Sequence, residues 1–395
     1  MSFTLTPVSG SGFVGREELA NELLAELLSQ NKIGFSISGG RRIGKTSLLK
    51  EVVRRINLSS KNKRIKVIYV SVWKVSPNTV DEFVQILSEA TIAAFQDELP
   101  NKFKFEELLA TGARALDRFL KGLKLSATVA KDLELSVSYI RRDSDDVTGA
   151  ITKAFSLPED LAELTKTRCV LIIDEFPSLT ELSYGRKNQV IGESIIKLVR
   201  TLYEDFKLTK LTIAGSERST LENLVTKARA PFYKQLLLRE VEPFNEEELS
   251  EFIQHYLPKT VFDKQAFDEL FQVSGGIPYN LQLLGQEIRL RDLNTIKKGD
   301  IETIVNSVLK KEGDLSFKEY VENCAPSEVK VLRALAREID LRPSEIASQE
   351  FMDLNTVGMS LTSLVKRGAI KRRARGAYTF SDRLFMEWLR SFERF

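Results

Sequence analysis

The sequence predicts an α/β core built on a parallel sheet, then an all-helical unit and a C-terminal winged helix-turn-helix. Residues 39–46 read GGRRIGKT and lie between a short apolar strand pattern and a helical pattern. Residues 169–175 form an apolar run that ends in two carboxylates, as expected of a strand covered on both faces. From residue 245 onward the patterns are helical until a short hairpin near the end.

The first motif along the chain is weak and the second is strong. Residues 13–17 read FVGRE before a helical pattern, and residues 39–46 fit the phosphate-binding loop pattern G-x-x-x-x-G-K-[ST] without a mismatch. Glycines let backbone N–H groups close around phosphate oxygens, and the following helix offers its positive end to the anion. We expect Lys45 to reach the β- and γ-phosphates of ATP and the Thr46 hydroxyl to ligate Mg²⁺. The residues expected to form the nucleotide-binding loop are Gly39, Gly40, Arg41, Arg42, Ile43, Gly44, Lys45, Thr46 and Ser47.

The next elements alternate between strand and helix patterns. Residues 66–72 indicate a buried strand, and helices are expected over residues 77–96 and 105–119. Two runs of alternating apolar residues then predict a β-hairpin insertion over residues 122–141. For this hairpin we favour edge strands that only pack beside the main sheet over a binding role.

The apolar run at residues 169–175 is the second strong element. Ligands of open parallel sheets bind outside the carboxyl ends of the strands, which is where this run places Asp174 and Glu175. Asp174 is expected to hold Mg²⁺, directly or through water, and Glu175 to polarise a water for attack on the γ-phosphate. The alternative is that both acids merely end a strand. A further strand at residues 211–216 ends in Ser216, whose hydroxyl either senses the γ-phosphate, orients the attacking water, or marks an ordinary strand end.

The remaining patterns divide the chain into three units. A long helix is expected over residues 188–206 and a last core strand over residues 236–241. Later helices are expected to start at residue 245 and to cover 263–273, 278–291 and 300–311. Glu312, Gly313 and Asp314 indicate a break before the third unit. The expected units are residues 1–243, 244–312 and 313–395.

The third unit has the pattern of a winged helix-turn-helix. Helices at residues 327–339, 343–348 and 355–367 precede two short strands around a basic turn. Residues 366–376 hold six basic residues and no acid, the clearest local charge concentration in the chain. The basic residues are Lys366, Arg367, Lys371, Arg372, Arg373 and Arg375. Duplex DNA and a protein partner, including a second copy of the chain, both stay open because winged helices serve in either role.

Composition excludes several classes of protein. With 395 residues and 43% hydrophobic content, the chain can form two or three hydrophobic cores. Its net charge of +3 is close to neutral, so the overall charge does not indicate nucleic-acid binding. Two cysteines and a single histidine leave almost nothing for a disulfide framework, a zinc site or histidine-based catalysis. The first residues lack a signal-peptide pattern, and no apolar run approaches membrane-spanning length. We therefore expect a cytoplasmic protein without a membrane partner.

Six motifs occur in one order along the chain. They are FVGRE at residues 13–17, the phosphate-binding loop, IIDEF at 172–176, AGS at 214–216, GGIP at 275–278 and the C-terminal winged helix. This combination resembles the archaeal ATPase family of the AAA+/STAND class of P-loop NTPases, relatives of origin-recognition initiators, over nearly the whole chain. The resemblance implies a slow, ATP- and Mg²⁺-binding ATPase with a helical lid over residues 244–312. It also implies that Gly15 and Arg16 line the nucleotide pocket, Ser216 is the first sensor, and Pro278 caps the nucleotide from the lid.

Two departures from the family pattern bear on function. Gly40 stands where the family often has Pro, and residues 232–235 read FYKQ where it commonly has Tyr-Gly-Arg. The missing arginine weakens the case for hydrolysis activated by a neighbouring subunit, and Arg218 and Arg229 are weak substitutes. Three functions remain: an ATPase switch, a DNA-binding regulator whose nucleotide only sets conformation, and an ATP-dependent scaffold that signals through protein contacts. The carboxylate pair favours turnover, and the basic wing favours DNA.

Overall fold

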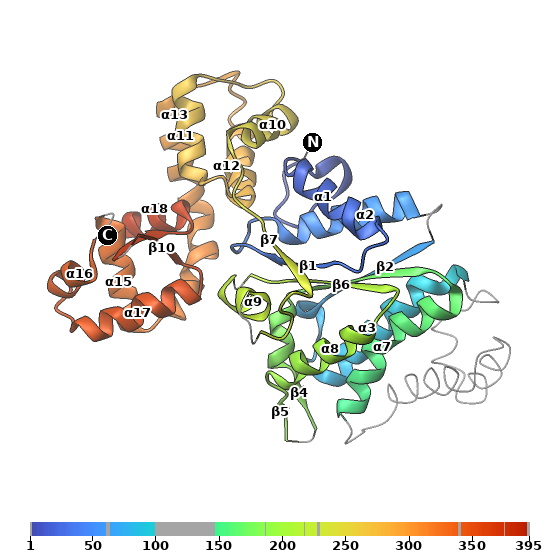
Figure 1. The fold of residues 1–395 in the computed structure, drawn as a ribbon. Coiled ribbons are helices and arrows are strands. Elements are labelled where there is room, and N and C mark those ends of the chain that lie inside the picture. The colour runs from blue at the N-terminus through green and yellow to red at the C-terminus, as the bar shows by residue number, and fades with distance from the viewer. Residues whose placement is uncertain are drawn as a thin grey trace.

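The computed structural model describes residues 2–60, 64–98, 147–185, 187–216, 218–226, 230–338, 341–374 and 376–392. The expected helix at 105–119 and the expected hairpin at 122–141 lie outside these residues. An α/β core is followed by a group of lid helices and then by the winged helix. In Figure 1 the lid helices lie at the top, the winged helix at the lower left and the core at the right.

Within the described residues, the core is a five-stranded parallel sheet in the order β2-β3-β6-β1-β7. All five strands expected from the sequence are confirmed in it. Their bounds are β1 Gly34–Ser38, β2 Ile65–Ser71, β3 Arg168–Asp174, β6 Thr209–Ala214 and β7 Leu236–Glu240. Because the strands are parallel, their carboxyl ends meet at one edge, and this edge carries every motif of the core.

Helices cover both faces of the sheet, which explains why β3 is apolar on both sides. Cys169, Leu171 and Ile173 enter one hydrophobic cluster, and Val170 and Ile172 enter another. On one face lie α1 (Glu17–Leu28) and α2 (Lys45–Ser60), and on the other lie α3 (Val80–Phe95), α7 (Val147–Thr165) and α8 (Ser194–Asp205) (Figure 1). The sequence did not predict α7, which carries the buried Pro158 in its interior. Tertiary packing outweighs the low helix propensity of proline there.

The helix expected over residues 188–206 is shorter than predicted, because it begins at Ser194. The residues before it form β5 (Gln189–Val190), which pairs antiparallel with β4 (Ser183–Tyr184). Asn188 and Gly192 have positive φ angles of 48° and 65°. Left-handed backbone at these two positions prevents the right-handed helix from extending to residue 188.

The lid helices agree with the prediction, but the expected break after them does not. The lid consists of α10 (Glu246–Tyr256), α11 (Lys264–Ser274), α12 (Pro278–Leu290) and α13 (Lys298–Val308), with a short parallel pair of β8 (Val261–Phe262) and β9 (Thr295–Ile296). Residues 312–314 are not a turn, because the π-helix η5 (Leu309–Lys318) continues α13 into α14 (Glu319–Glu322). A Cβ at Gly313 would lie 2.4 Å from Cδ1 of Trp388. The glycine therefore makes room for an indole ring rather than marking a chain reversal.

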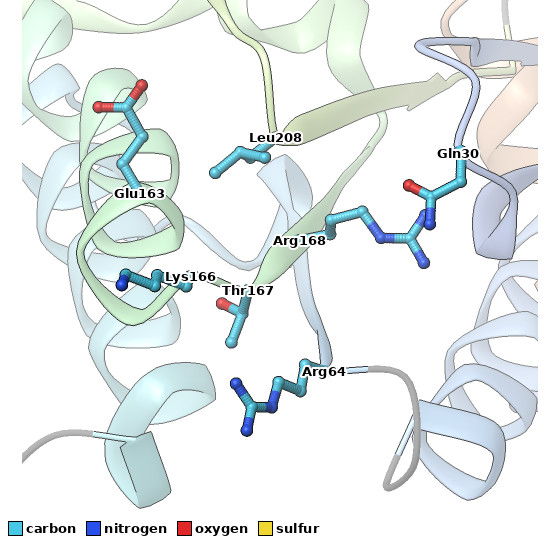
Figure 2. A pocket seen from close by; sticks show the side chains of 7 residues that line it. All are labelled: Gln30, Arg64, Glu163, Lys166, Thr167, Arg168 and Leu208. Carbon is cyan, nitrogen blue, oxygen red and sulfur yellow. The ribbon is translucent and has the colours of Figure 1, made fainter.

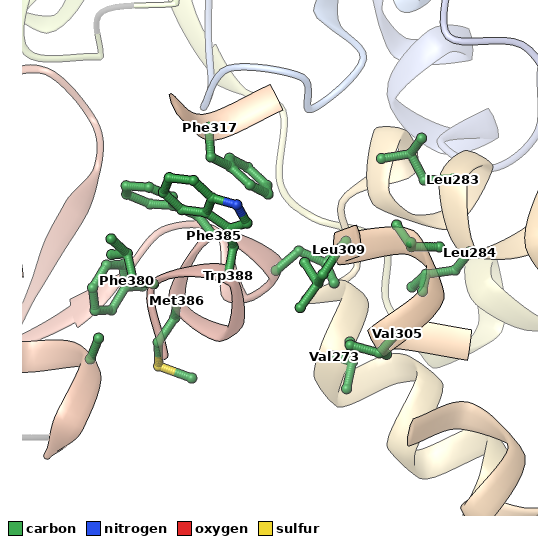
Figure 3. Packing of buried hydrophobic residues seen from close by; sticks show 14 of the residues in the cluster. Val273, Leu283, Leu284, Val305, Leu309, Phe317, Phe380, Phe385, Met386 and Trp388 are labelled. Atoms are coloured by element: carbon green, nitrogen blue, oxygen red, sulfur yellow. The ribbon is translucent and has the colours of Figure 1, made fainter. Parts of the chain in front are cut away.

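The winged helix has the predicted three helices and hairpin. They are α15 (Pro326–Arg337), α16 (Pro343–Gln349), α17 (Leu354–Lys366), β10 (Ile370–Ala374) and β11 (Ala377–Phe380), and an unpredicted helix α18 (Arg383–Phe392) follows. Lid and winged helix share one hydrophobic cluster, in which Leu284 and Leu309 belong to the same core as Phe385 and Trp388 (Figure 3). The expected boundary at 312/313 thus crosses a continuous helical segment, and the limits of the units remain predictions. None of the described helices is long and apolar enough to span a membrane.

Candidate active site at the carboxyl edge of the sheet

The phosphate-binding loop joins β1 to α2 and has a conformation that requires glycine. Gly39 and Gly44 have positive φ angles of 156° and 97°, and a Cβ at Gly39 would lie 2.8 Å from the Val241 carbonyl oxygen. The buried Lys45 donates from Nζ to the carbonyl oxygens of Gly39 (3.0 Å) and Gly40 (2.9 Å). Burial lowers the pKa of this ammonium, while the carboxylates of Glu175 and Asp174 raise it. The loop therefore holds a cation on its own carbonyl oxygens, within the electrostatic influence of the two acids at the end of β3.

Asp174 at the end of β3 is held by three donors. Its Oδ2 accepts from the Thr46 hydroxyl (2.8 Å) and the Tyr69 hydroxyl (2.8 Å), and its Oδ1 accepts from the Glu175 backbone N–H (3.0 Å). Burial and the neighbouring carboxylates raise the pKa of the Tyr69 phenol, which therefore stays a donor. Sequence reasoning missed Tyr69. The available signal was a hydroxyl-bearing residue within the buried strand beside β3.

Glu175 follows β3 in a left-handed conformation, with φ 54° and ψ 43°. Its side chain is 8% exposed and is held by Ser216, whose Oγ donates to Oε1 (2.7 Å) and whose N–H donates to Oε2 (3.2 Å). Burial raises the pKa of the Glu175 carboxyl, while the Ser216 hydrogen bond and the Lys45 charge lower it. The structure thus brings together the two residues that the sequence placed at the ends of separate strands.

Gly15 and Arg16 lie against the same loop. A Cβ at Gly15 would lie 2.8 Å from Cε1 of Phe244, so only glycine fits at this position. The Arg16 guanidinium lies 4.5 Å from the Phe244 ring centroid, and its Nη1 is 3.1 Å from where a Cβ on Gly44 would be. Burial lowers the pKa of Arg16 to about 10, and the charge of Glu248 acts in the opposite direction. Arg16 is therefore a buried cation at the loop that stays charged at neutral pH.

Pro278 reaches the loop from the lid. It is the first residue of α12, and its Cγ lies 3.9 Å from where a Cβ on Gly44 would be. Ser47 accepts the backbone N–H of Val8 at its Oγ (3.2 Å), which fixes the N-terminal segment to α2. Arg41 and Arg42 are exposed, and the Arg42 guanidinium lies 4.2 Å from the Tyr279 ring centroid.

The structure does not test the two arginines considered as activating residues. Arg229 lies outside the described residues, and Arg218 is described only as the first residue of α9 (Arg218–Val225).

The basic residues of the winged helix do not share one environment. Lys366, Lys371, Arg372 and Arg373 are exposed. Arg367 instead forms an ion pair with Glu328 (3.0 Å), and its guanidinium lies 4.7 Å from the Tyr320 ring centroid. Arg375 lies outside the described residues. The exposed basic residues therefore lie on strand β10 and at the end of α17. Arg367, one of the expected cations, is instead engaged in contacts within the fold.

A hollow at the opposite edge of the sheet is separate from this site. It measures about 610 Å³ and lies at the amino ends of β2 and β3. Figure 2 shows Arg168 pointing toward Gln30, while Glu163 extends from the last turn of α7 and Lys166 from the turn that follows it. Its lining residues are Gln30, Arg64, Glu163, Lys166, Thr167, Arg168 and Leu208. None of the motif residues lines this hollow, so it takes no part in the candidate site.

Comparisons with known proteins agree with this geometry. The sequence model of a family described as an ATPase domain predominantly from Archaea matches residues 13–284. The fold is similar to a solved Walker-type ATPase of Pyrococcus abyssi, with 22% identity, a TM-score of 0.69, and coverage of 99% of this chain and 100% of that one. It is also similar to the ORC2 protein of Aeropyrum pernix in its ADPNP–ADP complexes, with 12% identity, a TM-score of 0.52, and coverage of 96% and 94%. No curated protein matches the sequence.

Proposed function

The chain belongs to the family of ATPase domains found predominantly in Archaea, and on that premise we propose that it is a Mg²⁺-dependent switch whose nucleotide state controls its winged helix. Membership of the family makes it an ATP-binding protein that hydrolyses ATP. The metal dependence, the switch and the partner of the winged helix go beyond the family assignment. One observation carries the proposal: Thr46, Asp174, Glu175 and Ser216 converge beside the phosphate-binding loop.

The donor set beside the loop suits Mg²⁺. Thr46 Oγ1 and Asp174 Oδ2 are 2.8 Å apart and are both hard oxygen ligands. Mg²⁺ takes oxygen ligands and is usually held by one or two protein groups together with phosphates and waters. Thr46 and Asp174 would hold the ion, and Tyr69 would keep the carboxylate oriented. When bound, Mg²⁺ supplies neutralisation of charge on the phosphates.

We assign the phosphates to the loop and its cations. Backbone N–H groups of residues 39–47 and the N-terminus of α2 would bind phosphate oxygens, and the Lys45 ammonium would contact the β- and γ-phosphates. Arg16 adds a buried positive charge beside Gly44. Pro278 would cover the nucleotide from the lid, and Gly15 would let Phe244 approach the segment that precedes α1.

Glu175 is the proposed base. A carboxylate there would accept the proton of the attacking water as the water oxygen approaches the γ-phosphate. The raised pKa of Glu175 lies nearer to neutral pH than the pKa of an exposed glutamate, and a pKa near the working pH favours general base catalysis. Ser216 holds both carboxylate oxygens and would therefore position the base, and a γ-phosphate that competes for the Ser216 hydroxyl would be sensed there.

The switch rests on the contacts between lid, loop and winged helix. Pro278 and Tyr279 lie against the phosphate-binding loop. The lid shares its hydrophobic core with the winged helix, so the two are expected to move together. A nucleotide held between the core and the lid would therefore change the position of the winged helix.

Duplex DNA is the first proposed partner of the winged helix. Lys366, Lys371, Arg372 and Arg373 are exposed and would contact phosphates of the duplex backbone. A protein partner is the second candidate, because Phe351, Leu354 and Met359 on and before α17 are 95%, 55% and 67% exposed. Contiguous exposed apolar surface marks protein interaction sites.

A cytoplasmic location stays a prediction.

One experiment tests the proposal. ATP hydrolysis is measured with Mg²⁺ and with EDTA, each with and without duplex DNA, and the molecular mass is recorded in the ATP- and ADP-bound states. We expect hydrolysis only with Mg²⁺ and a change in rate with DNA. Undiminished turnover in EDTA would refute the metal assignment. A rate insensitive to DNA, together with a mass that doubles in one nucleotide state, would favour self-association over DNA as the role of the winged helix.

A further inference from the structure

Arg42 connects the phosphate-binding loop to two other parts of the molecule. Its backbone is left-handed (φ 62°), and its guanidinium lies 4.2 Å from the Tyr279 ring centroid and 5.9 Å from that of Phe317. Its Nη2 also donates to the Ser316 carbonyl oxygen (3.4 Å). Tyr279 lies in the first turn of lid helix α12, whereas Ser316 and Phe317 belong to η5, which leads into the winged helix. One loop side chain thus touches both the lid and the approach to the winged helix.

Aromatic contacts continue from Phe317 into the winged helix. The Phe317 ring lies 5.3 Å from Phe385 and 5.8 Å from Trp388, both on α18 (Figure 3). Trp388 donates from Nε1 to Asp314 of η5 (3.1 Å) and is 3% exposed. Phe385 in turn packs 5.7 Å from Phe380 at the end of the wing strand β11. Because these rings are close-packed, a displacement of the Phe317 ring displaces the Trp388 ring as well.

A second link runs through the residue after Tyr279. Asn280 donates from Nδ2 to Asp382 (2.9 Å), and Asp382 accepts the Phe385 N–H (3.3 Å) at the start of α18. Burial raises the pKa of the Asp382 carboxyl, and the charge of Arg42 is among the influences that lower it. The first turn of α12 therefore faces the phosphate-binding loop through Pro278 and Tyr279 and the winged helix through Asn280.

We propose that Arg42 is the positioning residue that couples occupancy of the phosphate-binding loop to the position of the winged helix. The inference deepens the proposed switch and rests on it. Phosphates bound in the loop bring negative charge near the Arg42 guanidinium and attract it. This attraction competes with the contacts that the guanidinium makes with Tyr279, Phe317 and Ser316. Because the guanidinium contacts both the lid and η5, phosphate binding in the loop changes the position of the lid and the winged helix. By thermodynamic linkage, the position of the winged helix changes the affinity of the loop for phosphate equally.

The two tryptophans allow a direct test. Trp73 and Trp388 are the chain's two tryptophans. In a Trp73→Phe background, emission reports on Trp388 alone, in full-length protein. ATP and ADP are added with Mg²⁺, and binding is measured in parallel by calorimetry. We expect ATP to change Trp388 emission in this background. Arg42→Ala should lose most of that change at saturating ATP. Arg42→Lys should restore only part of it, because a lysine keeps the charge but not the planar stacking surface.

Arg333→Ala is the control, since Arg333 is an exposed arginine on α15, outside the nucleotide-binding loop. It should keep the ATP-induced emission change at saturating ATP. If Arg42 were only structural, Arg42→Ala would lower the melting temperature and shift the resting emission while the ATP-induced change persisted, which would overturn the proposal. ATP binding with silent Trp388 emission in the Trp73→Phe background would also overturn the coupling but leave the ATPase intact. An absence of ATP binding would overturn the proposed function and the coupling together.

Discussion

Glu175→Gln should slow ATP hydrolysis and at the same time stabilise the folded protein. The amide fits the same space beside Ser216 but cannot accept a proton from water. A positioned general base contributes about 10²–10⁴-fold to the rate. At about 1.36 kcal/mol per factor of ten, the barrier should therefore rise by about 3–5 kcal/mol. ATP should still bind, because Lys45, Thr46 and Asp174 are unchanged.

The expected gain in stability follows from the sign of the pKa shift. Burial raises the pKa of Glu175 above its ordinary value of 4.5, so the fold favours the protonated carboxyl. That contribution to stability is complete below the ordinary pKa and is lost as the pH rises through the raised folded-state pKa. At neutral pH the ionised side chain therefore destabilises the fold. A neutral glutamine removes this penalty and keeps the shorter hydrogen bond from Ser216 Oγ at its single amide oxygen, losing only the longer one from the Ser216 N–H. The gain should shrink as the pH falls toward 4.5, where the wild-type carboxyl becomes protonated too.

Three measurements check this pair of effects. The turnover number comes from phosphate release, the ATP affinity from calorimetry, and the melting temperature from scanning calorimetry at pH 7 and at acid pH. Glu163→Gln is the matched control, because Glu163 is exposed at the opposite edge of the sheet. It should leave turnover and melting temperature unchanged. Wild-type turnover in Glu175→Gln would refute its role as the base, and a lower melting temperature at pH 7 would refute the electrostatic argument.

Three further variants test other parts of the structure. Lys45→Ala should abolish ATP binding, because it removes the cation held within the loop; wild-type affinity by calorimetry would contradict this. Gly313→Ala should lower the free energy of unfolding by about 1–3 kcal/mol through overpacking against Trp388, and an unchanged denaturation midpoint would argue against that contact. Alanine at four wing positions should weaken binding to any duplex and flatten the log–log salt slope by about two to four units, since each phosphate contact contributes about 0.9. No salt-dependent duplex affinity of the wild-type protein in either nucleotide state would refute the DNA proposal. The four positions are Lys371, Arg372, Arg373 and Arg375.

Errors in the expected elements came from residues whose role depends on distant partners. Gly313 looks like punctuation in the sequence, yet it lies inside a helical segment because Trp388, far along the chain, packs against it. Pro158 discourages a helix locally, yet α7 continues through it within a buried layer. Left-handed backbone at Asn188 and Gly192 delayed the start of α8. In each case a local preference was outweighed by packing or by turn geometry that the pattern did not encode.

The candidate site was more predictable than its surroundings because its motifs are local. The phosphate-binding loop and the acids after β3 are each contiguous in sequence, and parallel strands bring their carboxyl ends to one edge. Tyr69 was missed because its contact with Asp174 depends on the pairing of β2 with β3. Arg367 was grouped with the wing cations because composition records charge but not the ion pair with Glu328.

By itself, the sequence determined the parallel α/β core, the nucleotide-binding loop, the carboxylates of β3 and the winged-helix pattern, because backbone periodicity and short motifs are written in neighbouring residues. Only the tertiary structure decided that Ser216 holds Glu175, that the lid and winged helix share one core, and that Arg42 faces Tyr279 and Phe317. These are contacts between segments far apart in the chain. Their geometry is set by how the layers pack, and no local pattern specifies it.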